Sequence, residues 1–304
     1  MKATPIAENV IVKEKSHRHM LLNHGYFVAD FADENTLQKI DAFYRLHHHF
    51  NANNGGSFWS IYSQNEQYKR ETHQFLEEVL LTFKKNYLQQ FRTLINAFVV
   101  KTSGKNSAFD LHQDTTAMDE ERYSPLSIWI PLQDVNETNG CLHIVPYTHH
   151  YTSYYRAVSV PSKFSRVAHL ASEYAVPIPV SRGQALFFDN RVLHLSPPFD
   201  NGLERVAVVC GVMPQIAAYI NCFKNEAGDI EVYEQQDDFV LSNPYFLKNS
   251  EKRPTAGNMI KKAVLNEELI LQNQWEEIIQ QHQLVKSNFR NTSVFNSSPI
   301  QEPI

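Results

Sequence analysis

Short apolar runs interrupted by Pro, Gly and Asn follow one another along the middle of the chain, from residue 95 to residue 213. Brief runs of this kind, rich in β-branched and aromatic side chains and bounded by turn residues, are typical of strands. The pattern predicts eight strands, at 95–101, 107–112, 126–132, 141–145, 176–180, 185–188, 192–195 and 205–213. Eight short antiparallel strands in two sheets is the count of a jelly roll, so we expect a mainly β fold.

Apolar residues with helical spacing occur on both sides of this β-rich region. Residues 33–47 begin with acidic side chains and carry Leu37, Ile40 and Phe43 on one helical face. A short alternation before them predicts a strand that precedes the first helix. The helices are expected at 33–47, at 66–93 as one long helix or two, and at 265–280, with the preceding strand at 23–30.

Polar segments mark the loops and the ends of the fold. Residues 51–57 have loop composition, the acidic stretch 226–238 is expected to be exposed, and Asn243–Phe246 is expected to form a turn. Since no repeat or hinge composition is present, residues 1–304 are interpreted as a single domain. Its parts are a jelly-roll core at 95–214, helical decorations at 1–94 and 215–285, and a loose tail at 286–304.

Composition narrows the classes of function. Hydrophobic residues make up 42% of the chain and aromatic residues 12%, which is ample for a core. A net charge of −5 and a pI near 6.3 give no reason to expect a nucleic-acid or membrane partner. There is no apolar run of membrane-spanning length and no secretory signal. The odd set Cys141, Cys210 and Cys222 has no metal-type spacing and is expected to be buried, so we expect a reduced, cytoplasmic protein.

One constellation carries chemistry: His112 and Asp114, two residues apart, and the distant His194. Alternation along a strand places the imidazole and the carboxylate on one face. A second His would complete two nitrogens and one oxygen around a metal, and three coordination positions would stay open. Such sites are typical of non-haem Fe(II) oxygenases. Because the chain has 14 His, this motif alone is a weak indication.

Arg205 lies eleven residues after His194, next to the apolar run Val206–Val209. An arginine on a core strand needs an anion, because an unpaired buried guanidinium is unfavourable. Its planar fork suits a carboxylate, such as that of a 2-oxo acid. Lys101 is a further candidate for this role, although a solvated lysine at a strand end is the favoured interpretation.

The sequence around these residues resembles the phytanoyl-CoA dioxygenase family of Fe(II)/2-oxoglutarate oxygenases. The resemblance covers about residues 95–214 and rests on the ordered set of H-x-D, a W-I-P-L-x-D strand, N-G-C-L-x-x-x-P-x-T-H, a G-x-x-x-x-F strand, H-x-S and the downstream arginine. These motifs lie in Asp110–Thr116, Ser124–Asp134, Asn139–His149, Arg182–Ser196 and Arg205.

The resemblance implies a double-stranded β-helix with N-terminal helices packed on one sheet. It implies Fe(II), 2-oxoglutarate and O₂, with His112, Asp114 and His194 as metal ligands and Arg205 as partner of the distal cosubstrate carboxylate. By the same resemblance, Ser196 supports that carboxylate, and Ser127 and Trp129 line the cosubstrate pocket, with ordinary strand alternation as the alternative. Phe109 corresponds to a position that borders the cosubstrate in related ectoine hydroxylases, and a plain core phenylalanine is equally expected.

The expected function is therefore an Fe(II)- and 2-oxoglutarate-dependent dioxygenase that hydroxylates an unactivated C–H bond, with succinate and CO₂ as coproducts. The carboxylate of Asp114 favours hydroxylation, because related halogenases have a small residue at this position. The substrate would be a small metabolite, an amino acid or a lipid-like acid. Two alternatives stay open: a non-catalytic jelly-roll binding protein, and a cupin-type metalloenzyme that does not use 2-oxoglutarate.

Two other clusters have less specific interpretations. His47–His49 ends a predicted helix, and a solvated helix end is favoured over a metal site because consecutive residues point around a helix. Arg156, Lys163 and Arg166 form a basic insert that would suit an anionic substrate group, but a solvated loop is favoured.

Overall fold

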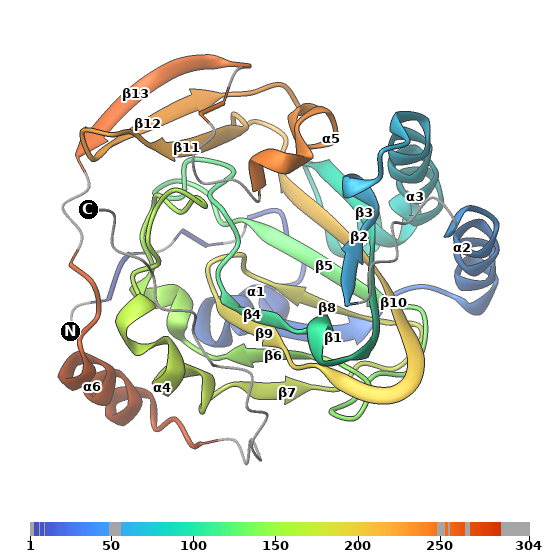
Figure 1. The fold of residues 1–304 in the computed structure, drawn as a ribbon, viewed down its shortest axis with the longest axis horizontal. Coiled ribbons are helices and arrows are strands. Elements are labelled where there is room, and N and C mark those ends of the chain that lie inside the picture. Colours follow the sequence, from blue (N-terminus) through green and yellow to red (C-terminus); the bar gives the residue numbers. More distant parts are fainter. Residues whose placement is uncertain are drawn as a thin grey trace.

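Two facing antiparallel sheets form the centre of the protein in the computed structural model, which describes residues 3–5, 7–8, 10–48, 56–247, 253–254, 256–264 and 268–286 (Figure 1). Every predicted strand between 95 and 213 is present, so the jelly-roll expectation is confirmed. The eight core strands are β3 (Phe91–Gly104), β4 (Phe109–His112), β5 (Leu126–Pro131), β6 (Leu142–Val145), β7 (Val176–Ile178), β8 (Gln184–Phe188), β9 (Leu193–Ser196) and β10 (Phe199–Pro214).

The strands are shared equally between the two sheets. One sheet has the order β4-β9-β6-β7, and the other has β8-β5-β10-β3 at its centre. The second sheet is extended by β1 (Tyr26–Asp30) at one edge and β2 (Ser57–Trp59) at the other. β1 confirms the strand predicted at 23–30. Ser57, which was expected in a loop, instead begins β2, because Phe58 pairs with Val100 of β3.

Helices cover the outer face of the six-stranded sheet (Figure 1). They are α1 (Lys15–His24), α2 (Glu34–His47) and α3 (Glu66–Tyr87). Asp33 caps α2 and Asn65 caps α3, each by accepting a hydrogen bond from a backbone N–H three residues on. Leu37 and Leu80 pack with Val208 of β10 in the core beneath them. The expectation of N-terminal helices on one sheet is therefore confirmed.

Two details of the helical prediction were wrong. The helix predicted over 66–93 ends at Tyr87, because residues from Phe91 onward pair with β10 and extend β3. α1 was not predicted, since its sequence is polar and Leu21 is its single buried residue.

The region after β10 differs from the expected helical decoration. It forms a separate three-stranded sheet of β11 (Ile220–Lys224), β12 (Asp229–Glu234) and β13 (Asn258–Val264). The short helix α5 (Phe239–Ser242) and the 3₁₀ turn Pro244–Leu247 lie between β12 and β13 in the chain. The acidic stretch 226–238 was expected to be exposed, and this was wrong for its middle part only. Ile230, Glu231 and Val232 are buried because β12 spans Asp229–Glu234, whereas residues 226–227 and 236–238 are exposed.

The C-terminal helix α6 (Gln272–His282) packs against the four-stranded sheet. Trp275 and Ile278 lie in one cluster with Leu193 and Leu195 of β9, near the short helix α4 (Ala168–Ser172). The helix predicted over 265–280 therefore begins later than expected. Residues 51–55, 265–267 and 287–304, where parts of the loop, helix and tail predictions fall, lie outside the described residues.

The remaining 3₁₀ turns are short connections, at Ser60–Tyr62, Lys105–Ser107, Thr148–Tyr151 and Ser165–Val167. Cys141, Cys210 and Cys222 are buried and free, as predicted. No helix in the described ranges combines the length and the apolar character needed to span a bilayer.

Candidate metal and cosubstrate site

His112, Asp114 and His194 come together at one end of the four-stranded sheet. His112 of β4 and His194 of β9 are direct cross-strand partners, and their ring centroids are 4.2 Å apart. The Nε2 atom of each imidazole lies 3.8 Å from Asp114 Oδ1. All three ligand atoms lie within 4.8 Å of one another, and no other metal-binding group was found among the described residues. The predicted triad is thus brought together.

Local hydrogen bonds point these ligand atoms at the same space. His112 Nδ1 lies 2.7 Å from the Asp110 carbonyl, and His194 Nδ1 lies 3.0 Å from the Val192 carbonyl. Since a carbonyl only accepts, each Nδ1 carries the proton and each Nε2 keeps its lone pair for a metal. The strand ends at His112, so Asp114 is placed by the following loop, where its backbone N–H donates to the Asn190 carbonyl.

The protonation state of His194 also suits a ligand. Burial, reinforced by the neighbouring His112 and opposed by Asp114, lowers the pKa of His194 to about 4. The imidazole is therefore neutral at neutral pH, which is the form that donates a lone pair to a metal.

Arg205 lies inside the jelly roll and has no anionic partner among the described residues. It is 1% exposed, and none of its three guanidinium nitrogens makes a hydrogen bond. The guanidinium lies over the Trp129 ring, 5.1 Å from its centroid. Burial lowers the pKa of Arg205 to about 9, so the group is still charged at neutral pH. An unpaired buried charge is strongly unfavourable, and a carboxylate of a bound ligand would relieve it.

Lys101 is buried beside Arg205, so the expectation of a solvated strand-end lysine was wrong. It is the cross-strand partner of Arg205. Its Nζ donates to Ser196 Oγ at 2.7 Å, to the Ser196 carbonyl at 3.0 Å and to the Pro197 carbonyl at 2.6 Å. In its protonated form this amine has three hydrogens, one for each of these three acceptors. Lys101 therefore fastens the chain just after His194, and Arg205 is the cation with free donors.

The other predicted residues surround this pair. Ser196 is fully buried; its Oγ accepts from Lys101 and donates to the Gly140 carbonyl. Ser127 and Trp129 share one face of β5, where Trp129 lies under Arg205 and Ser127 reaches the cavity described next. Phe109 is the cross-strand partner of Ser196, and its ring lies 5.7 Å from Lys101 Nζ.

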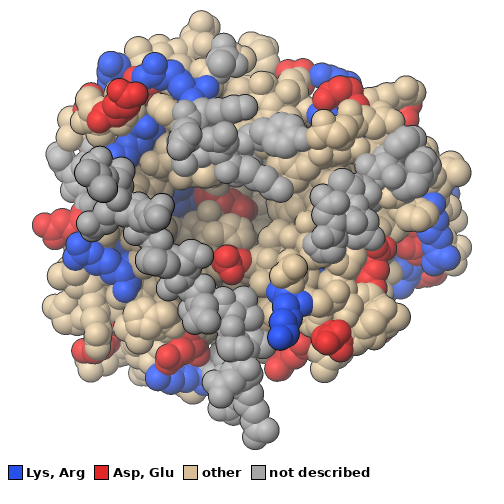
Figure 2. All heavy atoms as spheres, in the orientation of Figure 1, with Lys and Arg blue, Asp and Glu red and all other residues tan. Residues whose placement is uncertain are grey.

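A cavity of 570 Å³ opens beside the triad. His112 and Asp114 form part of its wall, together with residues from β3, β5 and β11. Figure 2, drawn in the orientation of Figure 1, shows the molecule hollowed between β11 and the start of β5. His112 and Asp114 therefore lie where a small molecule could reach a metal held by the triad.

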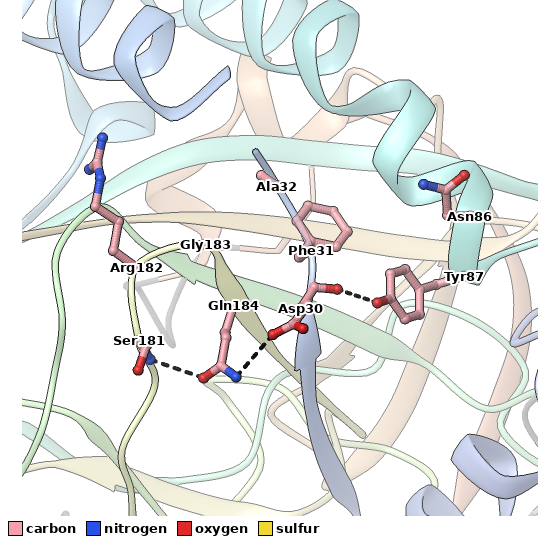
Figure 3. A pocket seen from close by; sticks show the side chains of 9 residues that line it. All are labelled: Asp30, Phe31, Ala32, Asn86, Tyr87, Ser181, Arg182, Gly183 and Gln184. Atoms are coloured by element: carbon pink, nitrogen blue, oxygen red, sulfur yellow. Dashed lines mark hydrogen bonds between the residues drawn. The ribbon is translucent and has the colours of Figure 1, made fainter. Parts of the chain in front are cut away.

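A second hollow, of 620 Å³, lies at the end of β1 and contains no comparable chemistry (Figure 3). Its polar groups bind one another: Tyr87 donates to the Asp30 carbonyl, and Gln184 donates to the Asp30 carboxylate. Arg182 at its rim already pairs with Glu34 and Asp41. No His or Cys lines it, so its size does not make it a candidate site.

Arg156 was expected in a solvated loop but is buried beside the triad. It forms a two-pronged ion pair with Glu120, with N–O distances of 2.6 and 2.8 Å. Its Nε donates to the Asp114 carbonyl at 2.8 Å. Arg156 is therefore not free for an anionic substrate. It ties the loop that carries Asp114 to the 152–156 segment.

We expect Arg156→Lys to lower the free energy of unfolding by about 1–3 kcal/mol, because an ammonium group offers no planar fork for Glu120. Iron affinity should fall with it, since the Asp114 carbonyl loses its donor. Urea denaturation and Fe(II) titration measure the two effects. The control is Arg166→Ala in the same insert, where the side chain is exposed. Unchanged stability in Arg156→Lys would contradict the role of the ion pair.

The histidines at the end of α2 make local contacts. His47 Nδ1 lies 2.9 Å from the Phe43 carbonyl, and His48 Nδ1 lies 2.7 Å from the Arg45 carbonyl. His49 lies outside the described residues. No metal-binding group includes His47 or His48.

A jelly roll whose interior presents two histidines and a carboxylate at one end is the architecture of the non-haem iron oxygenase class. Comparison with known proteins agrees with this class. The family model for phytanoyl-CoA dioxygenase matches residues 13–207, which is more than half of the chain. The chain belongs to the phytanoyl-CoA dioxygenase family.

Solved structures with this fold are distant in sequence. The epimerase SnoN, in complex with Fe³⁺, alpha-ketoglutarate and nogalamycin RO, is 15% identical, with a TM-score of 0.51 over 86% of this chain and 96% of that chain. EctD from S. alaskensis with bound Fe is 18% identical, with a TM-score of 0.49 over 70% and 83%. HygX from Streptomyces hygroscopicus, with nickel and 2-oxoglutarate, is 12% identical, with a TM-score of 0.49 over 67% and 88%. No curated protein matches the chain.

Proposed function

We propose that the protein is an Fe(II)- and 2-oxoglutarate-dependent dioxygenase that hydroxylates an unactivated C–H bond of a small molecule, releasing succinate and CO₂. The observation that carries the proposal is the buried Arg205 guanidinium without an anion among the described residues. Its cross-strand partner Lys101 contacts Ser196, two residues after the candidate ligand His194. Membership of the phytanoyl-CoA dioxygenase family supports the same reaction class.

Each site residue has a role in this proposal. His112, Asp114 and His194 hold Fe(II) and leave three coordination positions for cosubstrate and O₂. Bound iron with 2-oxoglutarate and O₂ supplies the oxidising chemistry. Arg205 binds the distal cosubstrate carboxylate, while Trp129 beneath it keeps water from the guanidinium.

The surrounding residues shape the same pocket. Lys101 holds Ser196 in place, which fixes the strand that carries His194. Ser127 and Phe109 border the cosubstrate and lead toward the 570 Å³ cavity, where the substrate would bind.

The alternatives make different demands on these residues. A non-catalytic binding protein needs no ordered ligand triad, and a cupin-type enzyme without a 2-oxo acid needs no buried Arg205. Among outcomes of the reaction, hydroxylation is favoured over halogenation because Asp114 supplies a carboxylate where a halide would need space.

The test is an anaerobic titration of the protein with Fe(II) and then 2-oxoglutarate, followed by visible absorption. We expect a weak charge-transfer band that requires both additions, and succinate formation once air is admitted. Succinate without any dependence on iron, or no band at saturating cosubstrate, would contradict the proposal.

The pKa of Lys101 leads to an expected pH dependence of cosubstrate binding. Burial, and then the nearby Arg205 guanidinium, lower the pKa of Lys101 to about 6. In the protein without 2-oxoglutarate, the Lys101 amine is therefore mostly uncharged at pH 7.5. A dianion bound at Arg205 raises that pKa, so the complex takes up a proton. Affinity for 2-oxoglutarate should therefore fall as the pH rises above 6 and should level off below 6.

Calorimetric titration with 2-oxoglutarate at pH 7.5, in phosphate and in Tris, measures this uptake. We expect different binding heats in the two buffers, because the buffer supplies the proton. Lys101→Met should remove the difference. Equal heats for the wild-type protein in both buffers would rule out the proton uptake.

A further inference from the structure

One wall of the 570 Å³ cavity comes from the segment that follows the family match. The match ends at residue 207, whereas Tyr219 and Asn221 of the β11 region and Val240 of α5 line the cavity. In Figure 1 the sheet β11-β12-β13 lies beside the start of β5, above the open side of the jelly roll. This C-terminal wall, formed by Tyr219, Asn221 and Val240, can therefore contact a small molecule that binds beside the triad.

The cavity between this wall and the triad is mainly apolar. Its lining includes Trp59, Tyr62, Leu94, Ile95, Val158 and Val160. Its charged side chains are few: Asp114 belongs to the triad, Arg156 is paired with Glu120, and Lys163 lies at the surface end. A chamber of this kind fits a molecule with an apolar body and few polar groups.

Asn221 is the exception on the C-terminal wall. It is 2% exposed, its NH₂ group donates to the Tyr219 hydroxyl oxygen, and its Oδ1 has no hydrogen-bond partner among the described residues. Strand alternation in β11 directs Ile220 and Cys222 into an apolar cluster with Ile230 and Val232 of β12, so Asn221 lies on the other face of β11. A buried acceptor without a donor is unfavourable, and a donor from a ligand would satisfy it.

We propose that the substrate is a small molecule with an apolar body and a hydroxyl or amino group, and that Asn221 accepts a hydrogen bond from that group. The C-terminal wall thus selects the substrate, while the jelly roll holds the metal and cosubstrate. This inference rests on the proposed function, because it takes the cavity beside the triad as the substrate chamber.

The experiment compares two probes that differ only in the donor, 2-naphthol and 2-methoxynaphthalene. Equilibrium dialysis measures their binding to the full chain loaded anaerobically with Fe(II) and 2-oxoglutarate. We expect wild-type protein to bind 2-naphthol about tenfold more tightly, the equivalent of one neutral hydrogen bond. Asn221→Leu should bind both probes equally, and Asn221→Asp, which keeps an acceptor, should retain the preference.

Two further variants locate the probe. Val240→Trp fills the C-terminal wall and should weaken both probes, whereas Met259→Ala, on the exposed strand β13, should change neither. The inference is overturned if wild-type protein shows no preference, if the preference survives in Asn221→Leu, or if Val240→Trp leaves both affinities unchanged. The iron–cosubstrate absorption band is recorded on the same samples. A missing band with an intact preference would reject the proposed function alone, and a normal band without preference would reject this inference alone.

Discussion

Replacing Asp114 with alanine is expected to abolish substrate oxidation while leaving the fold nearly intact. The carboxylate is one of the three proposed metal ligands and lies on a loop, so its loss would remove a metal bond and no core contact. Mutation of a residue that only hydrogen-bonds to a metal ligand typically lowers metal affinity or activity roughly 10–100-fold. Loss of a ligand itself should therefore lower turnover at least roughly 100-fold. Succinate formation with excess Fe(II), together with a thermal melt, measures the two properties.

The matched control for this variant is Asp110→Ala. Asp110 is exposed on β4, and only its backbone carbonyl contacts His112, so its side chain should be dispensable. Near-wild-type turnover by Asp114→Ala in the presence of Fe(II) would show that Asp114 is not a ligand.

Arg205→Ala is expected to raise the 2-oxoglutarate requirement far more than it weakens iron binding. Truncating one partner of a buried charged pair typically costs about 2–5 kcal/mol, which is roughly a 30- to 5,000-fold loss of cosubstrate affinity. Arg205→Lys should restore only part of this, because an ammonium group offers no planar fork. The concentration dependence of uncoupled succinate formation measures the loss, with Fe(II) affinity determined separately.

Stability provides a control for Arg205, since its guanidinium has no partner without the cosubstrate. Arg205→Met should leave the ligand-free protein as stable as the wild type or more stable, because it removes an uncompensated buried charge. If the alanine variant loses iron and cosubstrate affinity equally, Arg205 maintains the sheet and does not anchor the cosubstrate. An unchanged 2-oxoglutarate dependence would place the anchor elsewhere.

The core of the fold was predictable because its strands are short, strongly apolar and separated by Pro, Gly and Asn. The triad was predictable for a related reason: His112, Asp114 and His194 flank such strands and are embedded in family motifs. The proximity of His112 and His194 follows from the pairing of β4 with β9, which the jelly-roll topology fixes, whereas Asp114 is placed by the loop after β4.

What the sequence did not predict depends on contacts between distant segments. Lys101 looks like a solvated lysine until β3 is placed beside Ser196, and Arg156 looks exposed until Glu120 faces it. The sheet β11-β12-β13 was missed because its acidic residues suggest an exposed segment, although Ile230 and Val232 alternate with them in β12. That alternation is the signal that would have revealed the strand, and with it the wall that carries Asn221.

The cross-strand pairing of His112 with His194 links metal binding to the register in which β4 pairs with β9. A slip of β4 against β9 by one residue would turn one imidazole to the opposite face of the sheet, so only the native register forms a complete ligand set. Any metal that binds the native register and not the slipped one stabilises it by mass action. A bound metal would thus favour the native register of this strand pair over a slipped one.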